Sequence, residues 1–168
     1  LNPALKGAQT DEALNMFLLQ QAMKKRNQLA EAYKKLGINI NPLLLIQLPN
    51  DDSAAMSQDE ENLKDSLLQA LDVLNDTRTS NVEKKKRAIW LSGEKTNLEG
   101  IEAPKSGVDV LIFKQAIAMG WDCPRAAVLL IYIKLSSESF TIQTVGRIMR
   151  MPQQRFYNDP MLNTGYVY

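Results

Sequence analysis

The chain has 168 residues, of which 45% are hydrophobic and 23% charged, a composition typical of a globular domain with a buried core. Its 20 basic and 19 acidic side chains leave a net charge of +1, so total charge argues neither for nor against nucleic-acid binding. Because the chain has no histidine, Ser-His catalysis and most zinc sites are excluded, and a single cysteine excludes an internal disulfide.

The cellular setting follows from the same composition. No apolar run approaches the roughly 20 residues of a membrane span, and no signal peptide opens the chain, so we expect a cytoplasmic protein with no membrane partner. Cys123 is expected to pack in the core, because no histidine is present to activate its thiol. The first residue is Leu1 rather than methionine, which indicates a piece of a longer protein.

The first predicted element is a long helix over residues 10–36. Asp11 and Glu12 suit its first turn, and Gly37 supplies a stop. The basic run KKR at 24–26 is expected on the solvated side of this helix. Apolar side chains recur along it at helical spacing, at Leu14, Phe17, Leu18, Ala22, Leu29, Ala32, Tyr33 and Leu36.

The middle of the chain alternates between strand and helix patterns. The apolar run LLLIQL at 43–48 favours a strand buried on both faces. A capping box at 57–60 precedes a second helix, and AIWLS at 88–92 follows the basic run KKKR at 84–87 as a second strand. Residues 93–107 contain three glycines and a proline and are expected to be irregular. The second helix presents one apolar side, formed by Leu63, Leu67, Leu71 and Leu74.

The last third of the chain adds three more strands. VDVLIF at 108–113 and AAVLLIYI at 126–133 are buried strands, and GYVY at 165–168 begins a further strand. A helix is expected to begin near Glu138. Apolar strands separated by helices predict an α/β fold, with a parallel sheet flanked by helices on both faces. Ligands of such sheets bind beyond the carboxyl ends of the strands, where the segments after Phe113 and Ile133 both lie.

The sequence QTVGRIMR, residues 143–150, has a polar stripe. Gln143, Gly146, Arg147 and Arg150 are spaced so that a helix places them on one face. Two arginines one turn apart repel each other unless an anion lies between them, and guanidinium groups suit the oxygens of a γ-phosphate. An ordinary exposed helix face is the alternative explanation.

The segment KQAIAMGWDCP, residues 114–124, follows a predicted buried strand. Gly120 allows backbone N–H groups to approach a ligand, and the carboxylate of Asp122 can accept ribose hydroxyls. Lys114 and Gln115, at the exit of the strand, are able to reach a phosphate backbone. An ordinary turn explains the glycine and the aspartate equally well.

The order and spacing of these segments resemble motifs V and VI of superfamily 2 helicases and translocases. The chain looks most like the helicase part of the Res subunit of type III restriction enzymes, where GWDCPRA and QTVGRIMRMP are familiar forms, and LLLIQLPN at 43–50 resembles the motif IV strand of that family. The resemblance implies that residues 41–168 are the second RecA-like domain, truncated at its C-terminal end, and that residues 1–40 are a helical lead-in.

The resemblance also implies roles for individual residues. Arg147 and Arg150 would be the arginine fingers of motif VI, and Gln143 would lie near the γ-phosphate or the attacking water. Gly120 and Asp122 would lie near the ribose, whereas Lys114 and Gln115 would face nucleic acid. ATP and Mg²⁺ would be held mainly by a first RecA-like domain, since the chain has no G-x-x-x-x-G-K-[ST] sequence, and no metal ligand is assigned within the chain.

The partners implied by the resemblance are double-stranded DNA, the first RecA-like domain, a nuclease domain and a methyltransferase (Mod-type) subunit. Trp121 and Cys123 stand where many helicases have smaller or aliphatic residues, which fits the restriction-enzyme branch only. Two alternatives stay open at this point. One is another superfamily 2 DNA or RNA helicase, and the other is a non-enzymatic α/β scaffold whose arginine face docks an acidic protein.

Overall fold

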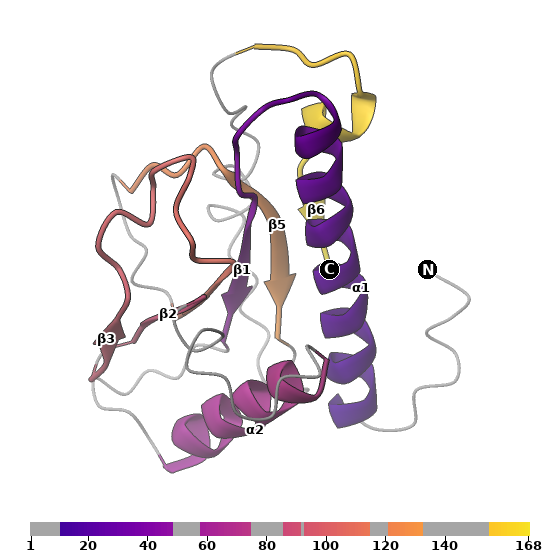
Figure 1. The fold of residues 1–168 in the computed structure, drawn as a ribbon. Coiled ribbons are helices and arrows are strands. Elements are labelled where there is room, and N and C mark those ends of the chain that lie inside the picture. The colour runs from indigo at the N-terminus through magenta and orange to yellow at the C-terminus, as the bar shows by residue number, and fades with distance from the viewer. Residues whose placement is uncertain (1–10, 49–57, 75–85, 92, 115–120, 133–154) are drawn as a thin grey trace.

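A computed structural model of the chain describes residues 11–48, 58–74, 86–91, 93–114, 121–132 and 155–168 (Figure 1). Two long helices, α1 (Asp11–Lys35) and α2 (Gln58–Leu74), accompany a six-stranded sheet, and a short 3-10 helix, η3 (Pro160–Asn163), precedes the last strand. The strands are β1 (Leu43–Gln47), β2 (Arg87–Trp90), β3 (Lys95–Thr96), β4 (Val110–Phe113), β5 (Ala126–Ile131) and β6 (Tyr166–Val167).

The sheet has the strand order β3-β2-β4-β1-β5-β6. Every neighbouring pair is parallel except β2 and β3, which are antiparallel. Parallel neighbours that are not consecutive in sequence require crossover connections, which is the organisation of an α/β fold. The predicted α/β class is therefore confirmed, and so are the long N-terminal helix and a last strand that begins in the sequence GYVY.

Both long helices lie against the same face of the sheet. Side chains of α1 and α2 share one core cluster with alternate residues of the four central strands, such as Leu44 and Ile46 of β1. A second cluster covers the opposite face, where Leu45 and Phe113 pack against Ile101 and Cys123. In the described residues this second face is covered by irregular chain rather than by a helix, and the helix expected near residue 138 lies outside them.

α1 begins and ends within one residue of its predicted bounds, but its buried side differs from the prediction. The helix buries Leu19 and Met23, which the predicted stripe omits, whereas Leu36, which the stripe includes, follows the helix and is exposed. The run KKR at 24–26 does not lie wholly in solvent as expected, because Arg26 is only 8% exposed. The reason is a tertiary ion pair, since Arg26 Nη2 lies 2.6 Å from Asp109 Oδ1.

α2 runs antiparallel to β2 and is tied to it by two ion pairs. Lys64 Nζ lies 2.8 Å from Glu94 Oε2, just beyond the carboxyl end of β2. Arg87 Nη2, at the amino end of β2, lies 2.7 Å from Asp72 Oδ1. The apolar side of α2 is as predicted, with Leu67 and Leu71 fully buried and Leu63 and Leu74 packed against the core.

The irregular segment at 97–109 is fixed at the amino edge of the sheet by buried polar groups. Arg125 Nε donates to the carbonyl oxygen of Ile101 at 2.7 Å, and its Nη1 donates to those of Asn41 and Val108 at 2.7 and 2.9 Å. Asn41 Nδ2 donates to the carbonyl oxygen of Ser106 at 2.8 Å. This loop has no regular backbone hydrogen-bond ladder, and side-chain donors instead bind its carbonyl oxygens.

Candidate functional site

The carboxyl edge of the sheet is the rim on which the predicted site residues were expected. Strands β4, β1 and β5 end at the same level of this edge. Leu48 N donates to the carbonyl oxygen of Phe113 at 2.8 Å, and Tyr132 N donates to that of Gln47 at 2.9 Å. β1 lies between β4 and β5, so the segments that follow Phe113 and Tyr132 depart from the same edge, on either side of one strand. Two loops leaving either side of one strand are the usual setting of a ligand site in a parallel sheet.

Two of the predicted site residues lie within the described part of the chain. Lys114 follows β4 directly and lies at the rim. The residue is only 6% exposed, so little of its side chain is in contact with solvent. Asp122 is exposed to solvent. The other predicted site residues, Gln115, Gly120, Gln143, Arg147 and Arg150, lie outside the described residues, and their roles stay predictions.

Trp121 anchors the chain immediately before Asp122. Its ring meets that of Trp90 edge to face, with centroids 6.3 Å apart and planes at 88°. Its indole Nε1 donates to Glu102 Oε1 at 2.7 Å. Lys95 Nζ lies 6.0 Å from the centroid of the Trp90 ring, at the outer limit of a cation–π contact. Asp122 therefore follows a ring that is held by Trp90 and by Glu102. The sequence analysis identified Trp121 only as a departure from other helicases and did not predict these contacts.

Cys123 is a packing residue, as the sequence predicts. Its side chain belongs to the second core cluster, on the face of the sheet opposite to α1 and α2, and is 4% exposed. Burial raises the pKa of the Cys123 thiol to about 11, with the positive charge of Arg125 acting in the opposite direction. The thiol is protonated at neutral pH, which does not suit a nucleophile.

Arg125 is the residue of this segment that the sequence analysis missed. Its side chain is 1% exposed and lies at the amino end of β5, on the edge of the sheet opposite to Lys114. Burial lowers the pKa of the Arg125 guanidinium from its ordinary value. The only sequence feature that marks Arg125 is its place immediately before an apolar strand. That place does not predict burial of the arginine unless the distant carbonyl groups that bind it are known.

The described residues contain no group of three or more acidic, histidine or cysteine side chains that could hold a metal ion. Within the same residues, no helix is long and apolar enough to cross a membrane. Comparison of the chain with protein-family models, with curated proteins and with solved structures found no match in any of the three. The sequence motifs and the geometry of the sheet are therefore the observations that bear on function.

Proposed function

We propose that the chain is the second RecA-like lobe of an ATP-dependent DNA translocase of the type III restriction kind. The observation that carries the proposal is the order of segments: a buried strand, KQAIAMGWDCP, another buried strand and then QTVGRIMR. The sheet supports it, because the two strands in question, β4 and β5, are parallel to β1 and end at one edge. The segments that follow these strands therefore leave the sheet at one rim.

In the proposed mechanism this lobe supplies half of an ATP site. A partner domain holds ATP and Mg²⁺, and closure brings Arg147 and Arg150 to the γ-phosphate, where guanidinium groups stabilise the charge of the transition state. Gln143, four positions before Arg147 in the sequence, orients the attacking water. Gly120 and Asp122 contribute backbone and carboxylate contacts near the ribose.

The same closure is proposed to couple hydrolysis to movement on double-stranded DNA. Lys114 and Gln115 would contact the phosphate backbone, so binding would be largely independent of base sequence and sensitive to salt. A nuclease domain and a Mod-type methyltransferase subunit would supply cleavage and site recognition.

The decisive experiment is substitution of Arg147 in the full-length protein. We expect Arg147→Ala and Arg147→Lys to lower DNA-stimulated ATP hydrolysis on the order of 10³-fold, because lysine cannot reproduce the planar donor pair. Arg155→Ala removes an exposed arginine eight positions further along the sequence and serves as the matched control, with hydrolysis unchanged. Unchanged hydrolysis in both Arg147 variants would contradict the finger role and favour the interaction scaffold.

A second measurement tests whether this chain supplies only half of the proposed ATP site. The 168-residue chain alone is expected to hydrolyse no ATP, because it has no phosphate-binding loop sequence. Magnesium-dependent turnover by the purified chain would overturn the proposal of a half-site.

A further inference from the structure

A groove of about 1120 Å³ runs along the exposed side of α1. Leu74 at the end of α2 and Met161 of η3 form part of its border. Asp159, also at the border, is occupied as the N-cap of η3, where its carboxylate accepts from Met161 N at 3.0 Å. None of the described residues that line the groove belongs to the helicase-like motifs, so the groove is independent of the proposed translocase function. The exposed residues that α1 contributes to it are Gln20, Lys24, Asn27, Gln28, Glu31 and Lys35.

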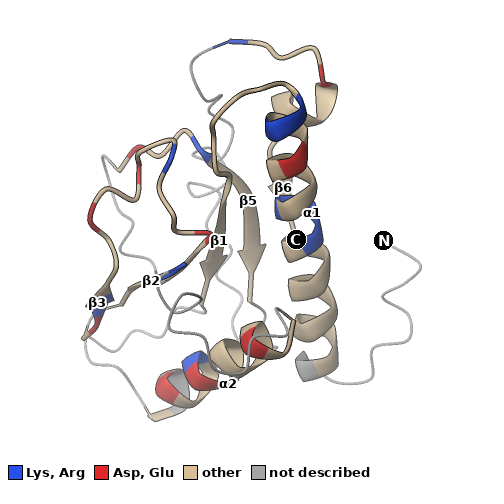
Figure 2. Cartoon of the chain, in the orientation of Figure 1, with Lys and Arg blue, Asp and Glu red and all other residues tan. Residues whose placement is uncertain are grey.

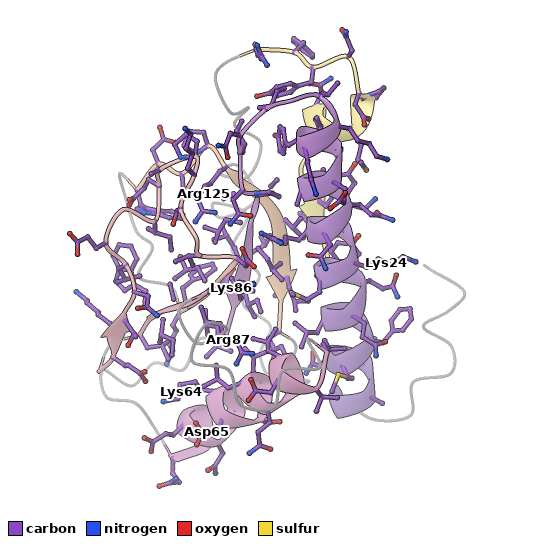
Figure 3. The ribbon with its side chains drawn as sticks, viewed as in Figure 1. Lys24, Lys64, Asp65, Lys86, Arg87 and Arg125 are labelled. Atoms are coloured by element: carbon purple, nitrogen blue, oxygen red, sulfur yellow. The ribbon has the colours of Figure 1, made fainter. Side chains whose placement is uncertain are left out.

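These polar residues share one face of the helix. With 3.6 residues per turn, their positions fall within about 100° of the helix circumference. Lys24 and Glu31 lie near the centre of this face, and Lys35 lies about one turn beyond Glu31. Figure 2 shows an acidic turn between two basic turns along α1, and Figure 3 shows Lys24 projecting away from the sheet. The face therefore carries charges of both signs, in the order positive, negative, positive.

The charges of this face are not used inside the described chain. Lys24, Glu31 and Lys35 are exposed, and they form no ion pair with one another or with any other residue that the structure describes. Lys25 differs from them, because its Nζ lies over the ring of Tyr166, 4.5 Å from the centroid. Exposed charges without an internal partner are available to a partner outside the chain.

A second copy of α1, in antiparallel orientation, matches this order of charges. When two antiparallel copies cross at a point between residues 27 and 28, residues whose numbers have the same sum lie opposite each other. This arrangement is symmetric, since each residue of a pair meets the other one twice across the contact. It brings no like charges of the face together. The opposing residues are Lys24 with Glu31, Asn27 with Gln28, and Gln20 with Lys35.

The border of the groove adds apolar surface to the contact. Leu36, directly after α1, is 43% exposed, and Leu74 and Met161 are partly buried. The polar face from residue 20 to residue 35 extends over roughly 23 Å of helix, at about 1.5 Å per residue. A contact of this length between two single helices is small and suits a weak, reversible dimer.

We propose that this face of α1 binds the same face of a second copy of the chain. Charge complementarity selects this occupant. A uniformly acidic partner would meet Glu31 with a like charge, and a uniformly basic one would meet Lys24 and Lys35 with like charges. An antiparallel copy meets the lysine and the glutamate at the centre of the face with opposite charges.

Sedimentation of the 168-residue chain at increasing concentration should show an equilibrium between monomer and dimer. Lys24→Glu and Glu31→Lys should each weaken the dimer on the order of tenfold or more, because each places two pairs of like charges across the contact. Lys34→Glu makes the same charge change at an exposed lysine of α1 outside the groove and should leave the equilibrium unchanged.

A mixture of the two single variants tests the pairing itself. Equal amounts of Lys24→Glu and Glu31→Lys should form a heterodimer, because opposite charges again face each other at both pairs, and this recombination also shows that both variants are folded. The double variant Lys24→Glu/Glu31→Lys should regain the homodimer. An unmodified chain that stays monomeric at every concentration would overturn the proposal. So would a dimer that the single substitutions do not weaken, or single variants that do not recombine.

Discussion

Arg26 and Asp109, separated by 83 positions in the chain, form an ion pair with Nη2 and Oδ1 2.6 Å apart. The pair joins α1 to the amino end of β4, and Arg26 Nη2 also contacts the side-chain oxygen of Asn41. Burial lowers the pKa of the Arg26 guanidinium, and the charge of Asp109 opposes that effect. A helix that covers the sheet is thus attached to it by charge as well as by apolar packing.

We expect this ion pair to behave as a coupled unit. Arg26→Met and Asp109→Asn should each lower the free energy of unfolding by about 2 kcal/mol, since each leaves a partly buried charge without its partner. The double variant should lose clearly less than the two single losses combined. Urea denaturation of the four proteins measures the difference. Additive losses would show that the two charges do not stabilise each other.

Arg125 should be the most sensitive polar position in the described part of the sheet. Arg125→Lys keeps the charge, but a single ammonium cannot reproduce the guanidinium geometry that reaches the carbonyl oxygens of Ile101, Asn41 and Val108 together. We expect a loss of about 3 kcal/mol in the free energy of unfolding, because buried carbonyls are left without donors. Arg155→Lys makes the same change at an exposed arginine and should alter stability by less than about 0.5 kcal/mol. A similar effect at both positions would contradict the anchoring role.

Cys123 should make stability depend on alkaline pH. The ordinary pKa of 9.0 rises to about 11 in the folded chain, mainly through burial. Between these values the unfolded thiol loses its proton while the folded thiol keeps it, so stability is full below pH 9 and falls as pH rises toward 11. The loss should reach roughly 2–3 kcal/mol at most. Cys123→Ala should flatten this part of the curve, whereas parallel curves for the two proteins would contradict the prediction.

The hydrogen bond between Trp121 and Glu102 should stabilise the segment that carries Asp122. Trp121→Phe retains an edge-to-face contact with Trp90 but removes the indole donor, so we expect a loss of about 1 kcal/mol. Glu102→Ala should cost less than Trp121→Phe, and the cost of Trp121→Phe should shrink when Glu102 is absent. Thermal unfolding of the cycle measures the coupling, and zero coupling would show that the bond does not contribute.

The sheet was largely predictable from the sequence because its strands are continuous apolar runs. Buried parallel strands require such runs, and LLLIQL, VLIF and AAVLLI stand out against their polar borders. β3 was not predicted, since a two-residue strand leaves no periodic pattern. Neither was the coverage of the sheet by α1 and α2 on one face, which depends on crossovers that local patterns do not fix.

The buried cations show where sequence reasoning stops. Arg26 looked like part of a solvated basic run because its partner, Asp109, is distant in the chain, and only the fold brings them together. Arg125 was overlooked because its partners are backbone carbonyls, which have no residue-specific signal. The proposed role of the arginines of QTVGRIMR follows from their spacing and from the motif that they resemble.

The N-terminal helix α1 packs against the C-terminal segment of the described chain. Lys25 of α1 lies over the ring of Tyr166 in β6, and the rings of Tyr33 and Tyr157 meet edge to face. A ribosome synthesises α1 before β6, so α1 cannot complete its packing until the segment from Tyr157 to β6 has emerged. Nascent chains halted before residue 157 should therefore leave α1 accessible to proteases, and folding should be governed by this late long-range contact rather than by the early helix.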